Sequence, residues 1–168
     1  NLKACRLCPR GCAVNRETTT GACQQTNIAR LTNGVVHTGE EPPLIKGSGA
    51  GAVFFSGCSM NCLYCQNFAF SQKNNGKNYT VEALGDLFLN LQAKGCSNLD
   101  LVTPSPHLMS ILEALIYAIE KGLTIPIVYN TSGYESVETL RLMEGIVDVY
   151  LADIRYTDDQ IGLKYSGV

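Results

Sequence analysis

The sequence predicts an α/β fold in which parallel strands alternate with helices, preceded by a small cysteine-rich module. Three observations support this prediction. Short apolar runs alternate with helix-period stretches along the second half of the chain, 45% of the 168 residues are hydrophobic, and seven of the eight cysteines lie before residue 66. A chain of this size and composition has enough apolar side chain to form one main domain with a real core.

We divide the chain into a cysteine-rich metal or iron–sulfur module with its linker, residues 1–40, and the α/β domain, residues 41–168. Two prolines at 42–43 and glycines at 47, 49 and 51 mark irregular chain at the junction. The formal net charge of −2 gives no electrostatic reason to expect a nucleic-acid partner. No apolar run has the length of a membrane helix, so we expect no membrane partner either.

The elements of the α/β domain follow from hydrophobic spacing. Residues 52–55 are continuously apolar, which predicts a strand buried on both faces. The polar stretch 66–79 has the composition of a loop. Thr80 is then the expected N-cap of a helix with an apolar face from Val81 to Leu91, and Gly95 ends it.

The same rhythm continues to residue 154. We expect a strand at 99–103, a helix that begins at Ser105-Pro106, a strand at 125–129, a short helix at 136–144 and a strand at 147–154. About four βα units cannot close an eight-stranded barrel, and a parallel edge strand would be left uncovered. We therefore expect a partial barrel that belongs to a longer protein.

The cysteines fall into two groups. Cys58, Cys62 and Cys65 form a C-x3-C-x2-C motif directly after the first buried strand, where α/β proteins build their sites. Spacings of two to four residues are typical of a metal or cluster site rather than of a disulfide framework. Three thiolates are one short of the four that a structural zinc or an ordinary [4Fe–4S] cluster requires. In an iron–sulfur cluster, one iron would then have no protein ligand. The alternative is a zinc site whose fourth ligand is His37 or His107.

The other group is a closed site near the amino terminus. It offers four ligands for zinc or a second iron–sulfur cluster, and spacing does not choose between them. These ligands are Cys5, Cys8, Cys12 and Cys23. Cys96 stands alone and is expected to be a small core residue.

The segment around the second group resembles the radical S-adenosylmethionine (SAM) superfamily, and within it the activating enzymes of glycyl-radical enzymes, typified by pyruvate formate-lyase activating enzyme. The likeness spans about residues 50–158 and rests on the Phe-Phe-x-Gly-Cys lead-in at 54–58, the cysteine triad, Leu63-Tyr64 within it and Asn67 after it. The sequence Cys-Arg-Leu-Cys-Pro-Arg-Gly-Cys at 5–12 is similar to the start of an uncharacterised branch of these proteins. The resemblance implies a TIM-like barrel.

It also implies a [4Fe–4S] cluster on Cys58, Cys62 and Cys65, with SAM chelated to the open iron. One electron would split the sulfonium into methionine and a 5′-deoxyadenosyl radical that abstracts a substrate hydrogen. No catalytic side chain is expected beyond the cluster-bound cofactor. The cofactor-binding positions that the resemblance implies are Tyr64, Thr103, Asn130, Ser132, Asp153 and Arg155.

Each of these positions also has a simpler interpretation. Tyr64 can serve to pack the loop, Asn130 and Ser132 are typical of a turn before a helix, and Asp153 with Arg155 can form a surface ion pair. The family's acidic Gly-Gly-Glu element is absent after the second strand, where backbone carbonyls or Thr103 would have to replace it. His107 is expected to be solvated in the first turn of its helix.

Three functions follow. The first is an oxidoreductase that activates a glycyl-radical enzyme; the second is the same chemistry on another peptide or a small molecule. The third is a non-enzymatic iron–sulfur or zinc protein that carries electrons or binds a partner. The first two imply a flavodoxin- or ferredoxin-like electron donor and, because the chemistry is oxygen-sensitive, a location in the cytoplasm of an organism or compartment with low oxygen.

Overall fold

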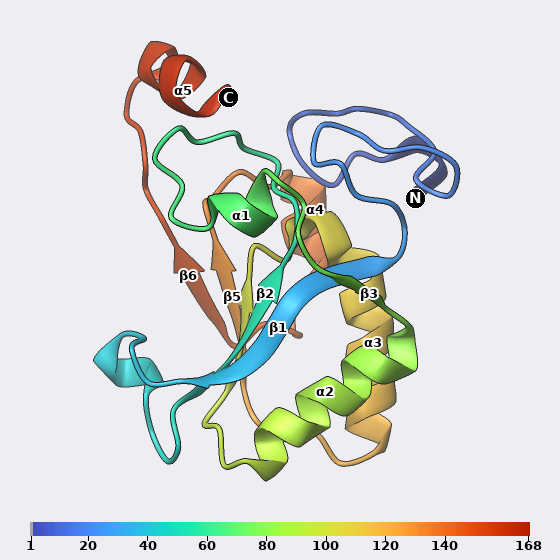
Figure 1. Ribbon diagram of the computed structural model, residues 1–168, viewed down its shortest axis with the longest axis vertical. Coiled ribbons are helices and arrows are strands. Elements are labelled where there is room, and N and C mark those ends of the chain that lie inside the picture. Colours follow the sequence, from blue (N-terminus) through green and yellow to red (C-terminus); the bar gives the residue numbers. More distant parts are fainter. Residues whose placement is uncertain (1) are drawn as a thin grey trace.

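The computed structural model describes residues 2–168, which build a six-stranded sheet with the strand order β3-β1-β2-β4-β5-β6 (Figure 1). β2, β4, β5 and β6 run parallel to one another, whereas β1 is antiparallel to both β2 and β3. The strands are β1 (Ala29–His37), β2 (Ala50–Phe55), β3 (Lys77–Tyr79), β4 (Leu99–Val102), β5 (Ile127–Thr131) and β6 (Val149–Ala152).

Helices follow β4 and β5 as the sequence predicts. The α-helices are α1 (Phe68–Ser71), α2 (Val81–Ala93), α3 (Leu108–Glu120), α4 (Val137–Leu142) and α5 (Asp159–Ser166), and the short 3-10 helices are η1 (Leu2–Ala4), η2 (Pro42–Leu44) and η3 (Ser105–His107). The backbone N–H of Ala83 donates to the Thr80 hydroxyl at 3.2 Å, which confirms the predicted N-cap of α2. In the described residues, no helix has the length and hydropathy required to cross a membrane.

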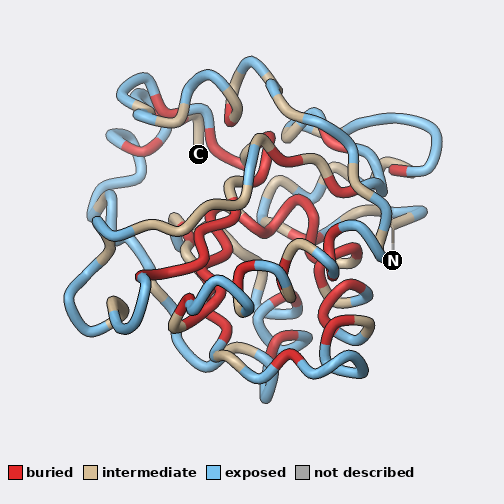
Figure 2. The backbone as a smooth tube through the Cα atoms, turned by 60° about the horizontal axis from the view of Figure 1, so that its bottom comes forward, coloured by how far each residue is buried: buried red, intermediate tan, exposed pale blue. Residues whose placement is uncertain are grey.

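The main core lies between the sheet and the pair α2–α3, which cover one face of it (Figures 1 and 2). Leu84 and Phe88 of α2 and Ile111 of α3 are fully buried against Val53 of β2 and Leu101 of β4. Alternate residues of a strand point to opposite faces. The other face of the parallel strands therefore carries the intervening residues, among them the buried Asp100.

Two α-helices and two strands were not predicted. The polar stretch 66–79 was expected to be a loop, but it contains α1 and β3, and strand β1 and helix α5 lie outside the predicted set. β1 occupies residues 29–37 and pairs with β2 from Leu31 to His37, with an irregularity between Leu31 and Asn33. α1 and β3 have only four and three residues, too few for a periodic hydrophobic signal, so neighbouring segments determine their structure.

The predicted partial barrel is an open sheet over the described residues, with β6 at one edge and β3 at the other. Figure 1 shows the amino-terminal segment, the loop after β2 and helix α5 together at the end where the parallel strands terminate. This is the end at which α/β folds carry their functional groups.

Candidate functional site

The loop of residues 56–67, which we call the cluster loop, leaves the carboxyl end of β2 through a glycine. Gly57 has a φ of +77°, and a Cβ atom at this position would lie 2.5 Å from the carbonyl oxygen of Cys23. Its N–H donates to the Phe70 carbonyl at 2.9 Å. Only glycine combines this left-handed conformation with so close an approach of two backbones.

The cluster loop presents three thiols. All eight cysteines lie within the described residues and are free, so no disulfide joins either group. Burial, and to a lesser extent the neighbouring thiols of Cys62 and Cys65, raises the pKa of Cys58 to about 11. A buried thiol of this kind keeps its proton until a metal ion replaces it.

Each sulfur of the triad has a hydrogen-bond partner. The backbone N–H of Met60 donates to Cys58 Sγ at 3.4 Å, and Cys65 Sγ lies 3.2 Å from the Ser71 hydroxyl. The Ser166 hydroxyl donates to Cys62 Sγ at 2.9 Å. Hydrogen bonds to ligating sulfurs are among the factors that set the potential of an iron–sulfur cluster.

Helix α5 holds the cluster loop through its last turn. The N–H groups of Asn61 and Leu63 donate to the carbonyls of Ser166 and Tyr165, both at 2.9 Å. These carbonyls belong to the group that a helix leaves without internal partners at its carboxyl end. Two backbone hydrogen bonds therefore hold the cluster loop against the last turn of α5.

Tyr64 and Arg155, two of the expected cofactor residues, lie beside the triad. The Tyr64 hydroxyl is 2.5 Å from that of Tyr156. Arg155 donates to Asp153, as the ion-pair alternative predicts. Burial lowers the pKa of Arg155, but Asp153 and Tyr64 together raise it above its usual value. The charge of Arg155 also acts on Cys58, so the guanidinium belongs to the surroundings of the thiols.

The remaining expected residues follow β4 and β5. Thr103 has a φ of +57°, an uncommon conformation for a residue with a branched side chain, and its N–H donates to the Asn130 carbonyl at 3.0 Å. The Asn130 amide donates to Asp100 at 3.5 Å, and Ser132 is half-buried beyond the strand end. These groups share one end of the sheet with the triad, yet no direct contact joins them to its sulfurs in the described residues.

Glu135 is a functional candidate that was not predicted from the sequence. Ser105, after β4, and Thr131, at the end of β5, both donate to the Glu135 carboxylate. Tyr129 extends this network with a hydrogen bond to Ser105 at 3.2 Å. A carboxylate is therefore present at the end of β4, although it belongs to a loop thirty residues further along the chain than Ser105. Its position directly before the N-cap Ser136 was the only available signal.

The expectation of a solvated His107 was wrong. Its side chain is buried, stacks on Phe55 with ring centroids 5.4 Å apart, and lies 2.8 Å from the Ser56 carbonyl through Nε2. Burial is the main cause that lowers the pKa of His107 to about 4. The neutral ring ties η3 to the start of the cluster loop.

Neither histidine completes a zinc site with the triad. The Nε2 atom of His107 is occupied by Ser56, and His37 pairs with Ala50 at the opposite end of β2, where it lies 3.5 Å from Glu40. Within residues 2–168, no three or more His, Cys, Asp or Glu side chains already stand in position to hold a metal ion. The donors available at the cluster loop are thiols, which suit an iron–sulfur cluster.

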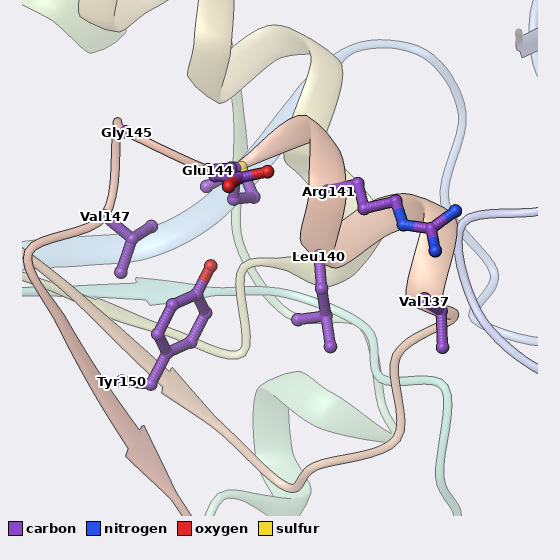
Figure 3. A pocket seen from close by; sticks show the side chains of 8 residues that line it. Val137, Leu140, Arg141, Glu144, Gly145, Val147 and Tyr150 are labelled. Carbon is purple, nitrogen blue, oxygen red and sulfur yellow. The ribbon is translucent and has the colours of Figure 1, made fainter.

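A pocket of about 500 Å³ lies elsewhere, between α4 and β6 (Figure 3). Leu140, Val147 and Tyr150 line it with largely apolar surface. It includes none of the expected site residues, and none of the thiols faces it.

Comparison with known proteins agrees with the site. The family model described as the radical SAM superfamily matches residues 52–165, and the chain belongs to this superfamily. It is 34% identical to the uncharacterized protein MJ0674 of Methanocaldococcus jannaschii over 176 residues, which cover 99% of this chain and 50% of that protein. The chain thus spans about half the length of the curated relative. Membership implies an enzyme that uses a [4Fe–4S] cluster and SAM.

Proposed function

We propose that Cys58, Cys62 and Cys65 hold the [4Fe–4S] cluster and that SAM binds at its open iron. The observation that supports this most strongly is the placement of three free thiols in one loop at the carboxyl end of β2, inside the segment that matches the superfamily. When bound, the reduced cluster supplies the electron that splits SAM into methionine and a 5′-deoxyadenosyl radical.

Residues around the triad have distinct tasks in this proposal. The Arg155 guanidinium offers a bidentate fork to the carboxylate of SAM, and Asp153, its present partner, keeps it oriented. The exposed Tyr64 ring offers an apolar face to the adenine. Helix α5 covers the outside of the loop and, by excluding water, protects the radical from side reactions.

The polar groups beyond β4 and β5 are proposed to bind the rest of the cofactor. Glu135 is the acid available for the amino group of SAM, with Thr103 nearby in the strand-end loop. Asn130 and Ser132 offer hydrogen bonds to the ribose. This assignment replaces the missing Gly-Gly-Glu acid by a carboxylate that Ser105 and Thr131 already hold in place.

The chemistry is tested by product formation. We expect anaerobically reconstituted protein, reduced in the presence of SAM, to release 5′-deoxyadenosine and methionine in equal amounts. Replacement of any triad cysteine by alanine should abolish release, whereas Cys96→Ala is the matched control, because Cys96 lies buried near α2 and away from both groups. An iron-loaded protein that forms neither product would contradict the proposal and favour an electron carrier.

We further propose that the hydrogen donor is a glycyl residue of a partner enzyme, on the strength of the activating-enzyme likeness at Asp153-x-Arg155. Incubation with pyruvate formate-lyase and SAM should then give the doublet of a glycyl radical in electron paramagnetic resonance (EPR). Release of 5′-deoxyadenosine without this radical would contradict the glycyl target and favour another peptide or a small molecule. The electron donor in this proposal is a flavodoxin- or ferredoxin-like protein.

A further inference from the structure

The amino-terminal segment brings its four cysteines within electrostatic range of one another. Cys5 donates its N–H to Val14 and accepts from Ala13 through its carbonyl, at 3.0 and 2.9 Å, which closes a small loop. The N–H of Ala22 lies 3.5 Å from Cys12 Sγ. We call the following set the amino-terminal thiols: Cys5, Cys8, Cys12 and Cys23.

The amino-terminal thiols interact electrostatically. Burial is the main cause that raises the pKa of Cys8, and the other three amino-terminal thiols raise it further. The loop that carries them is anchored to the domain, since Thr139 donates to the Leu7 carbonyl at 2.7 Å and Ser110 to the Asn27 carbonyl at 2.8 Å. The segment is therefore a fixed part of the molecule.

A buried cation next to these thiols has no anionic partner. Arg16 is only 2% exposed, and its guanidinium donates to the carbonyls of Gln25 and Thr26. Among residues 2–168, no carboxylate forms an ion pair with it. Its charge acts on Cys23 and lowers the pKa of that thiol against the larger effect of burial. Buried charges are almost always paired, and an anionic metal–thiolate centre would pair this one.

The amino-terminal thiols also adjoin the cluster loop. Arg10 Nε donates to the Ser59 carbonyl at 2.9 Å, and the close approach of Gly57 to Cys23 brings the two backbones together. Cys23 and Cys58 line one polar cavity of about 180 Å³. One cysteine from each group therefore borders the same space.

We propose that the amino-terminal thiols hold a second iron–sulfur cluster that passes electrons to the cluster of the triad. The relay rests on the proposed function, because SAM cleavage consumes one electron per turnover. A flavin or iron–sulfur donor protein loses one electron to the second cluster, which then returns to its oxidised form as the triad cluster gains that electron. Zinc has no redox chemistry and could not do this.

Metal content tests the site apart from activity. In the Cys58→Ala/Cys62→Ala/Cys65→Ala protein, reconstituted anaerobically, we expect about two to four irons with matching sulfide. Reduction should give an EPR signal that does not respond to SAM. Replacement of Cys12 and Cys23 by serine in that background should remove the iron, whereas Cys96→Ser should keep it. Zinc in place of iron, or no metal at all, would overturn the proposal and leave the triad chemistry untouched.

The electron path is tested in the protein with its triad intact. In Cys12→Ser/Cys23→Ser protein that retains the SAM-dependent EPR change, release of 5′-deoxyadenosine with reduced flavodoxin should fall at least tenfold. Release with dithionite, a small reductant that can reach the triad cluster directly, should fall much less. Equal rates with flavodoxin in the variant and the parent would overturn the relay. In an Arg16→Met variant whose urea unfolding matches that of the parent, iron should be lost from the second site; retention of that iron would show that the charge of Arg16 does not hold the centre.

Discussion

Single residues in the cluster loop control both its path and its ligands. Gly57 is required by two observations, a positive φ and the close approach to Cys23. We predict that Gly57→Ala lowers the free energy of unfolding by more than about 1 kcal/mol, because the side chain adds left-handed strain and a steric overlap. Urea unfolding measures this loss. Gly122→Ala is the control, because Gly122 has a positive φ with open space around it, and a loss no larger than in the control would contradict the role of close approach.

Ser166 connects the end of α5 to a sulfur of the triad. Its hydroxyl donates to Cys62 Sγ and lies 2.5 Å from the Tyr156 hydroxyl. Ser166→Ala should make the reduction potential of the triad cluster more negative, because a hydrogen bond to the sulfur stabilises the reduced, more negative form. Stability should fall by about 1 kcal/mol. A spectroscopic redox titration checks the potential, and an unchanged or more positive value would count against the hydrogen bond.

His107 makes stability depend on pH in a defined direction. Its folded-state pKa of about 4 lies below the ordinary value, so the unfolded chain binds a proton that the folded chain excludes as the pH falls. This costs about 2 kcal/mol of stability at pH 5 relative to pH 7.5, and His107→Gln should remove the cost. Unfolding of parent and variant across this range measures it.

Asp100 supplies a comparison of opposite sign. Burial, and next Glu40, raises its pKa to about 7, so the folded chain holds a proton that the unfolded chain has released, and stability falls as the pH rises from about 4 to 7. As the pH rises, the free energy of unfolding of Asp100→Asn should therefore increase relative to that of the parent. For His107→Gln it should decrease relative to that of the parent. Slopes of the same sign in both variants would contradict these assignments.

Among the helices and strands, sequence signals predicted those helix starts that depend on interactions between neighbouring residues. α2 begins at its N-cap Thr80, and α4 begins after Ser136, whose hydroxyl accepts from the Thr139 N–H at 3.3 Å. We predict that Thr80→Ala costs about 1 kcal/mol in the free energy of unfolding, whereas Thr80→Ser costs little, because serine keeps the capping oxygen. Thermal or urea unfolding checks this, and equal losses in both variants would show that the cap is not the cause.

The missed elements depend on partners that are distant in sequence. β1 contains Asn33 and Gly34, which are poor strand formers, but it gains its structure by pairing with β2. The exposed helix α5 carries little apolar periodicity and is held by the cluster loop through Asn61 and Leu63. Neither contact can be derived from spacing along a single sequence, because each joins segments that only the fold brings together.

The candidate site shows the same division. The C-x3-C-x2-C spacing was enough to propose the triad as a ligand set, because short spacings bring the cysteines together within one loop. Glu135, Ser166 and the buried state of His107 were not predictable, since each depends on a hydrogen bond to a residue at least 30 positions away. Arg16 was missed because nothing in its neighbours indicates burial.

For the whole molecule, the sheet ends at the uncovered edge strand β6, which is where a closed barrel would continue with further strands. Val149 and Tyr150 of β6 are partly exposed, and the pocket of Figure 3 lies beside them. The triad, α5 and the amino-terminal thiols nevertheless lie at one end of the described sheet (Figure 1). The parts proposed for electron entry and for SAM binding are thus both contained in this chain, which spans half the curated relative.

In the proposed function, one iron of the triad cluster has no protein ligand and is free to bind SAM. EPR of the reduced, reconstituted protein before and after addition of SAM detects this binding. We predict that the signal of the triad cluster changes shape on addition of SAM, and that the change is lost in Cys58→Ala, Cys62→Ala and Cys65→Ala proteins but kept in Cys96→Ala. A signal of the fully loaded protein that SAM leaves unaltered would contradict the account.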